Sequence, residues 1–220
     1  GSPGSQVHLP VWGANDSDGR IRWTRDFWAT TVDDTSLSGI LINVAPPCMA
    51  YVEIGGVWCW VLTSDSDGRW WYAQDIAANY NANGSLKTSA WVAGTTATRV
   101  MADIAQSTFE DVTCMVGNHS RIIRTTDWTS WTDVHNTGGP VIGGIATDNA
   151  GTWIAIERDT GKPIRSTDGG LTWTNPTVQK RTGESGAYAS ATTLIPTGTV
   201  VHGNGMWLIT GATSYAYSPD

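Results

Sequence analysis

The chain has little charge and no long apolar runs. Only 15% of its 220 residues are charged, and acidic residues outnumber basic ones, giving a net charge of −7. A protein that binds duplex nucleic acid needs a basic face, so we expect no nucleic-acid partner. The apolar runs fall well short of the roughly 20 residues that a membrane-spanning helix needs, so we expect no membrane insertion.

Cysteine and histidine are also scarce. Cys48, Cys59 and Cys114 are odd in number and irregularly spaced, which is not the pattern of a disulfide framework. Cys48 and Cys59 could pair across a hairpin, but buried free thiols are the preferred interpretation. The histidines are scattered and no Cys-x-x-Cys motif is present, so we expect neither a bound metal nor a cofactor.

Glycine and tryptophan are abundant. The chain has 25 Gly and 13 Trp, and no stretch keeps a helical apolar period with caps. This composition is typical of many short strands joined by tight turns, so it predicts an all-β fold. Gly1–Ser5 reads as an expression-vector scar and no signal peptide is recognisable, so the domain is expected to occupy residues 6–220.

One short phrase, S-x-D-x-G-x-x-W, recurs five times and is called the turn motif below. Its complete copy contains Ser166, Asp168, Gly170 and Trp173. The Ser and Asp oxygens can accept hydrogen bonds from nearby backbone N–H groups, and Gly170 permits a positive φ. Trp173 is expected to pack back on the turn. The motif therefore predicts a structural turn with no catalytic or metal-binding role.

The other copies of the turn motif are incomplete. Asn15–Trp23 carries one extra residue, and Ser218–Asp220 is only a first half. The remaining two copies keep part of the motif: Ser64, Gly68 and Trp71 in one, and Thr125, Asp127 and Trp131 in the other. The copies recur at intervals comparable with a propeller blade of about 40–50 residues, which predicts a repeat architecture.

The turn motif resembles the Asp-box, or bacterial neuraminidase repeat. The resemblance implies a β-propeller in which the motif forms the turn between the third and fourth strands of each blade, at the outer rim. Sialidases, xyloglucanases, sortilin-type receptors, a photosystem assembly factor and phage tail proteins carry this repeat. It is therefore specific for the fold and only weakly indicative of function.

The expected propeller has four four-stranded blades, with five blades or a fragment of a longer array as alternatives. In the four-blade version an N-terminal strand completes the last blade and closes the ring. The predicted strands are Val7–Trp12, Arg20–Trp28, Val57–Leu62, Trp70–Ile76, Thr98–Ile104, Asp111–Val116, Arg121–Thr125, Trp131–Val134, Val141–Ala146, Trp153–Glu157, Pro163–Ser166, Thr172–Val178, Thr192–Ile195, Met206–Thr210 and Tyr215–Ser218.

Catalytic signatures are weak. The Arg-Ile-Pro motif of sialidases is matched neither by Arg20-Ile21-Arg22 nor by Pro163-Ile164-Arg165, and no Tyr-Glu nucleophile pair stands out. A glycoside hydrolase of another type needs two carboxylates about 5–10 Å apart. The candidate carboxylates are Glu53, Asp103, Glu110, Asp111, Glu157 and Glu184, and the sequence does not show that any two converge.

Surplus aromatic residues and two long polar segments suggest a binding surface. Ala77–Ala97 and Thr177–Ala191 are predicted as loops, and deletion of 79–89 is expected to leave the domain folded. Trp58, Trp60, Trp153 and Trp207 are predicted to be core residues. The predicted ligand-binding residues are Trp28, Trp70, Tyr80, Trp91, Arg181 and Tyr188.

Two function classes remain open. The first is a non-enzymatic recognition module, similar in composition to bacteriophage tail proteins, that works with other subunits of a larger assembly and attaches it to a surface glycan or a protein receptor. The second is a glycoside hydrolase with an unrecognised carboxylate pair. The first predicts an extracellular or virion-associated protein. The sequence leaves open the ligand, the oligomeric state and any catalytic activity.

Overall fold

The computed structural model is an all-β protein whose described residues form five antiparallel sheets. It describes residues 12–15, 21–24, 32–34, 48–63, 69–81, 86–95, 101–176, 199–210 and 215–219. No helix within this described part is long and apolar enough to cross a membrane.

Each sheet is formed by strands that follow one another in the chain. Sheet 1 contains β1 (Trp12–Asn15), β2 (Ile21–Thr24) and β3 (Val32–Asp34). Sheet 2 contains β4 (Cys48–Ile54), β5 (Val57–Thr63), β6 (Arg69–Gln74) and β7 (Val92–Thr95). Sheet 3 contains β8 (Met101–Ser107), β9 (Val112–Gly117), β10 (Arg121–Thr125) and β11 (Thr132–His135). Sheet 4 contains β12 (Ile142–Thr147), β13 (Trp153–Glu157) and β14 (Pro163–Ser166), and sheet 5 contains β15 (Thr199–Gly203), β16 (Met206–Thr210) and β17 (Tyr215–Pro219).

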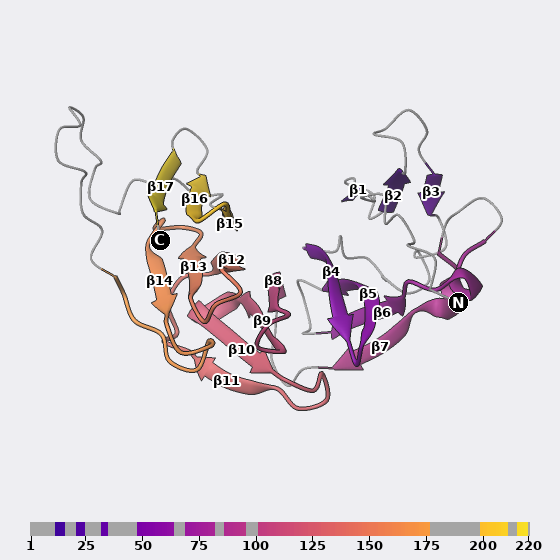
Figure 1. Cartoon of the computed structure of the whole chain (residues 1–220), viewed down its shortest axis with the longest axis horizontal. Helices are drawn as coiled ribbons and strands as arrows, with labels where there is room; N and C mark the ends of the chain where they lie inside the picture. Colours follow the sequence, from indigo (N-terminus) through magenta and orange to yellow (C-terminus); the bar gives the residue numbers. More distant parts are fainter. Residues whose placement is uncertain are drawn as a thin grey trace.

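The sheets are arranged side by side along an arc (Figure 1). The first strands of sheets 2 to 5, β4, β8, β12 and β15, contact one another in series and lie along the inner side of the arc. Later strands of sheets 2 to 4 lie further out. This is the radial order of a β-propeller, in which each blade packs between its neighbours.

The number of sheets agrees with the five-blade alternative, and the predicted ring closure is wrong. The N-terminal strand β2 pairs with β1 and β3, and it does not join β15–β17 among the described strands. Its hydrogen-bonding edges are therefore taken by its own neighbours in the chain. Figure 1 places sheets 1 and 5 at opposite ends of the arc.

Most predicted strands in sheets 3 to 5 are confirmed. β10, β13, β14 and β16 have the predicted bounds, and β8 begins a few residues later than expected. Thr192–Ile195 lies outside the described residues, and β15 supplies the first strand of sheet 5. Of the predicted strand Thr172–Val178, the described part forms a single bridge, between Thr174 and Arg165.

Sheet 2 differs from the prediction. Trp70–Ile76 was expected to be a fourth strand, but β6 is the third strand of its sheet. Ala77–Ala97 was expected to be a loop, but it contains two short 3-10 turns, η2 (Ala77–Asn79) and η3 (Thr88–Ala90), and the fourth strand β7. The motif Ser64–Trp71 therefore lies between the second and third strands, and its Gly68 and Ser64 are outside the described residues.

Apolar layers between consecutive sheets form the core. Val52 and Val61 of sheet 2 pack with Met115 and Ile123 of sheet 3. The layer between sheets 3 and 4 contains Cys114, Ile122, Trp153, Ile164 and Trp173. Ile156 of sheet 4 packs with Val200 and Trp207 of sheet 5. The three cysteines are free, as the preferred interpretation expected, and Val52, not Cys48, lies opposite Cys59.

The complete turn motif, Ser166–Trp173, forms the predicted hydrogen-bonded turn after β14. Asp168 Oδ1 accepts from Ser166 Oγ at 2.7 Å and from the N–H groups of Leu171 and Thr172 at 3.1 and 2.9 Å. Gly170 has a φ of +78°, and Trp173 Nε1 donates to the Gly170 carbonyl at 3.0 Å. The Trp173 ring therefore packs back on the turn that joins β14 to the bridge residue Thr174.

The shortened motif Thr125–Trp131 forms a related turn between β10 and β11. Asp127 Oδ1 accepts from the N–H groups of Thr129 and Ser130 at 2.9 and 2.7 Å, and Thr125 Oγ1 accepts from that of Trp128 at 2.9 Å. The motif lacks its glycine, and Trp128 takes the positive φ of +60° that glycine adopts more readily. Trp128 and Trp131 then pack against Trp70 of sheet 2.

Polar side chains also hold consecutive sheets together near the inner strands. The Gln106 amide accepts from the Glu53 N–H and donates to the Glu53 carbonyl, both at 2.6 Å. Asp103 of β8 accepts from Cys48 Sγ of β4 at 3.3 Å and from the Ile145 N–H of β12 at 3.0 Å. These bonds fix the relative positions of sheets 2, 3 and 4.

Candidate functional site

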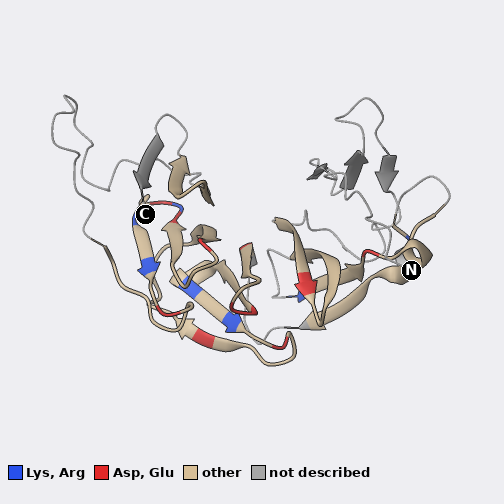
Figure 2. Ribbon diagram, viewed as in Figure 1, with Lys and Arg blue, Asp and Glu red and all other residues tan. Residues whose placement is uncertain are grey.

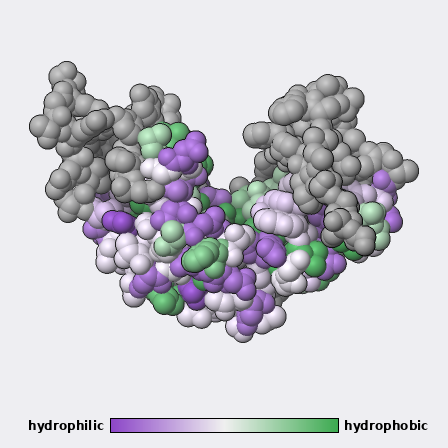
Figure 3. All heavy atoms as spheres, viewed as in Figure 1, coloured by the Kyte–Doolittle hydropathy of each residue, from purple (hydrophilic) through white to green (hydrophobic). Residues whose placement is uncertain are grey.

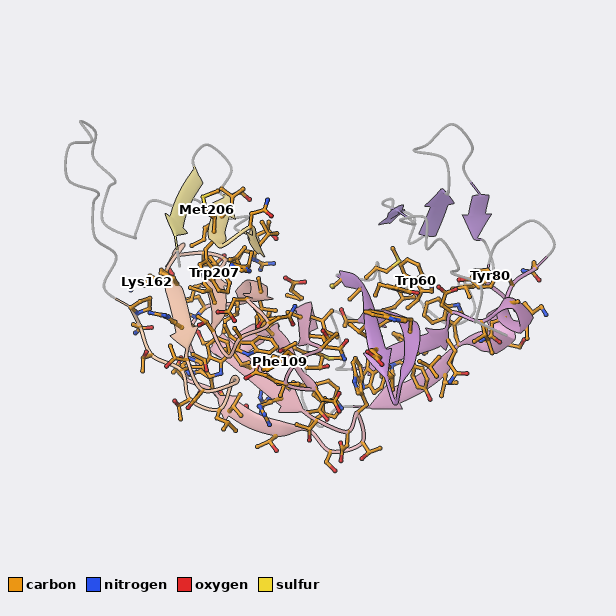
Figure 4. The ribbon with its side chains drawn as sticks, viewed as in Figure 1. Trp60, Tyr80, Phe109, Lys162, Met206 and Trp207 are labelled. Atoms are coloured by element: carbon orange, nitrogen blue, oxygen red, sulfur yellow. The ribbon has the colours of Figure 1, made fainter. Side chains whose placement is uncertain are left out.

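An aromatic surface, made of Tyr51, Trp58, Trp60, Asp75 and Tyr80, covers one face of sheet 2. The register of β4 and β5 places Tyr51 opposite Trp60 and Glu53 opposite Trp58. Residues two apart in a strand share a face, so these four side chains lie on the same side of the sheet. Figure 4 shows that Trp60, from β5, and Tyr80, from the segment after η2, lie near each other.

Trp58 is the most accessible aromatic residue of this surface. Its ring stacks on that of Tyr51, with centroids 5.0 Å apart and an interplanar angle of 11°. Of the whole residue, 39% is accessible to solvent, although one face of the indole stacks on Tyr51. The stack holds the indole in one orientation before any ligand arrives, which lowers the entropy cost of binding.

Asp75 organises the aromatic side chains by accepting hydrogen bonds from two tyrosines. Tyr51 Oη donates to one carboxylate oxygen at 2.6 Å and Tyr80 Oη to the other at 2.5 Å. Trp60 Nε1 donates to Tyr80 Oη at 3.3 Å, and the Asp75 N–H donates to the Trp58 carbonyl at 2.8 Å. Burial raises the pKa of Tyr51, and the hydrogen bond to the Asp75 carboxylate raises it further. Tyr51 therefore stays protonated near neutral pH and donates this hydrogen bond to Asp75.

The structure brings two of the predicted ligand-binding residues, Tyr80 and Trp91, into one apolar cluster on sheet 2 and places Trp70 in another. Tyr80 belongs to the aromatic surface. Trp70 and Trp91 are only 3% and 9% exposed, so each is packed in an apolar layer and has little ring left for a ligand to stack on. The predicted Trp28, Arg181 and Tyr188 lie outside the described residues.

The segment predicted as a removable loop is part of the core. Leu86 is 1% exposed, and it packs with Trp91 against Trp60, Leu62 and Trp71 of sheet 2. Deletion of 79–89 would remove Leu86 and uncover this apolar face. The packing of Leu86 argues against the expectation that the domain stays folded, and we expect the deletion to destabilise it.

Sequence reasoning placed Trp58 and Trp60 together in the core, and this is right only for Trp60. Trp58 lies one residue after the start of β5, next to the Gly55-Gly56 turn, where the sheet ends and solvent begins. Its cross-strand partner is a charged residue, Glu53. A tryptophan beside a turn and opposite a carboxylate was the signal in the sequence.

The candidate catalytic carboxylates have structural contacts or stand apart. Glu110 accepts from Trp153 Nε1 at 3.3 Å, and Glu157 accepts from the Ser120 and Thr160 hydroxyls at 3.3 and 2.5 Å. Asp103 is bound as described above, Asp111 lies in the β8–β9 turn, and Glu184 is outside the described residues. No group of three or more His, Cys, Asp or Glu side chains in the described ranges is placed to hold a metal ion.

No model of a known protein family matches the chain, and no curated protein matches it. Several solved structures do match the chain. The chain is similar to YCF48 from Cyanidioschyzon merolae, with 14% identity, a TM-score of 0.57, and coverage of 95% of this chain and 66% of that one. It is similar to the GH74 xyloglucanase from Xanthomonas campestris, with 12% identity, a TM-score of 0.58, and coverage of 96% and 34%. It is also similar to a chain of a nidogen/laminin complex, with 15% identity, a TM-score of 0.53, and coverage of 95% and 88%.

These similar structures are β-propellers, and the chain has a β-propeller-type fold. Identities of this size show the fold alone. The chain spans less than two thirds of the length of YCF48 and about a third of the xyloglucanase.

Proposed function

We propose that the chain is a non-enzymatic recognition module that binds a surface glycan or a protein receptor through its aromatic surface. In this proposal it belongs to the attachment apparatus of a larger assembly, of the kind found in bacteriophage tails, and acts outside the cell or on a virion. The turn motifs are assigned to the Asp-box repeat, because Ser166, Asp168, Gly170 and Trp173 each make the contact or conformation that the repeat requires.

The observation that carries the proposal is the exposed Trp58, which is stacked and fixed from behind. Large aromatic side chains in fixed orientations dominate binding energy at interfaces, and aromatic rings also stack on the apolar faces of sugars. Figure 2 shows acidic and basic residues scattered over the sheets, and Figure 3 shows hydrophilic and hydrophobic residues mixed on the face in view.

The structurally similar proteins show the fold alone, so they do not decide between the two ligand classes. One similar structure is a xyloglucanase, and another belongs to a nidogen/laminin complex. The enzymatic alternative has less support, because the candidate carboxylates Asp103, Glu110 and Glu157 are held in structural hydrogen bonds.

Binding of the chain to a glycan array and to an array of receptor-type peptides tests the proposal, together with an assay for new reducing ends. We expect saturable binding that Trp58→Leu weakens at least tenfold, and no release of reducing sugars. Phe109→Leu is the matched control, since Phe109 is 83% exposed in the β8–β9 turn and lies well apart from Trp60 and Tyr80 in Figure 4. Equal binding by wild type and Trp58→Leu would refute the proposed site, and release of reducing ends would favour the hydrolase.

A further inference from the structure

Two carboxylates flank the exposed indole of Trp58. Glu53 lies directly opposite Trp58 on β4, so their Cβ atoms are about 5 Å apart. On the other side, the Asp75 N–H donates to the Trp58 carbonyl at 2.8 Å, which places Asp75 beside Trp58, directly after the end of β6. The row Glu53–Trp58–Asp75 therefore sets an aromatic ring between two acidic residues at the end of sheet 2.

This row is held in place before a ligand binds. Both backbone groups of Glu53 are bound by the Gln106 amide at 2.6 Å, so the position of its Cα is fixed. The Trp58 ring is fixed by its stack on Tyr51, whose hydroxyl is bound to Asp75. The Glu53 carboxylate is only partly buried and has no hydrogen-bond or ion-pair partner in the described part of the chain.

The chemistry of the row selects a cationic ligand. Ionised carboxylates only accept hydrogen bonds, while sugar hydroxyls both donate and accept. A guanidinium only donates, is planar, and stacks on the face of a tryptophan, where the ring quadrupole attracts it. The same sheet already contains such a contact, since the Arg69 guanidinium lies 5.7 Å from the centre of the Trp71 ring.

We propose that Trp58 and Glu53 form a docking site for an arginine side chain of a protein partner. The guanidinium stacks on the open side of the indole and donates hydrogen bonds to the Glu53 carboxylate. The net charge of −7 attracts a basic segment toward this surface. The inference rests on the proposed function and narrows it to a protein ligand with an exposed arginine.

The test uses the full chain, labelled with ¹⁵N, and two short capped peptides, Ac-Gly-Arg-Gly-NH₂ and its citrulline counterpart. Citrulline has the shape of arginine without its charge. The indole N–H signal of Trp58 is identified by its absence from Trp58→Leu. We expect the arginine peptide to shift this signal in a saturable way, the citrulline peptide to shift it little, and Glu53→Gln to weaken binding about fivefold or more.

Controls separate local effects from loss of the fold or general attraction. Trp58→Leu and Glu53→Gln should keep the circular dichroism spectrum of the wild type, and Phe109→Leu should bind the arginine peptide with unchanged affinity. Equal shifts from the two peptides, or a Glu53→Gln variant that binds arginine as the wild type does, would overturn the inference. If Trp58 binds a glycan but not the arginine peptide, the inference fails while the proposed function stands. If neither ligand class depends on Trp58, both fail.

Discussion

Replacing Asp168 by alanine should destabilise the chain without affecting its binding surface. The Asp168 carboxylate accepts four hydrogen bonds within one turn, from Ser166 Oγ, from the N–H groups of Leu171 and Thr172, and from Thr172 Oγ1 at 2.6 Å. Within the turn, the Asp168 carboxylate is the hydrogen-bond acceptor for the N–H groups of Leu171 and Thr172. Asp168→Ala removes all four bonds and leaves these donors to water.

The expected loss in the free energy of unfolding is about 1–2 kcal/mol. This value is well below the summed free energy of four separate hydrogen bonds. Asp168 is exposed, so hydrogen bonds to water replace part of those that the substitution removes. The same contacts predict a pH dependence. Hydrogen bonds from the Thr172 hydroxyl and N–H lower the pKa of Asp168 to about 2, below its ordinary value of 3.8. The stabilisation is therefore present above about pH 4 and is lost as the pH falls toward 2.

Urea unfolding of wild type and Asp168→Ala, followed by tryptophan fluorescence at several pH values, measures both effects. The difference between the two proteins should be largest near neutral pH and should shrink as the pH approaches 2. Asp168→Asn is the matched control, because it keeps one acceptor oxygen and does not titrate. A variant as stable as the wild type at pH 7, or a difference that stays constant down to pH 2, would refute the structural role of the carboxylate.

Three further predictions concern the packing between strands and sheets. Gly94→Ala should lower the melting temperature and cost roughly 2 kcal/mol or more, because an added Cβ would overlap the ring of Trp70; an unchanged melting temperature would contradict this packing. Gln106→Ala should cost about 1–3 kcal/mol and speed hydrogen exchange at the Glu53 amide, and exchange at the wild-type rate would show that the Gln106 contact is dispensable. Burial raises the pKa of Cys114 to about 12, so iodoacetamide should modify it at pH 8 only after denaturation; rapid modification of the native protein would show that the thiol is accessible.

Local sequence signals were sufficient for the fold class and for most strands of sheets 3 and 4. Strands such as Trp153–Glu157 lie between turns that the chain marks clearly, and each pairs with its neighbour in sequence. The turn motif Ser166–Trp173 was predictable down to its hydrogen bonds, because its donors and acceptors all lie within eight residues. Short-range contacts need no knowledge of the rest of the molecule.

Contacts between distant segments were decided by the tertiary structure. Residues 77–95 look like a polar loop, but packing of Leu86 and Trp91 on sheet 2 turns them into a core segment and a fourth strand. The Gly55-Gly56 turn marks the end of sheet 2 beside Trp58 in the sequence, but the stack of Tyr51 on the indole is formed only in the folded sheet. The partners of Asp75, and the bond from Gln106 to Glu53 across 53 residues, likewise arise only when the sheets come together. These side chains come into contact because the strands and sheets pack together, and no short-range sequence pattern predicts that packing.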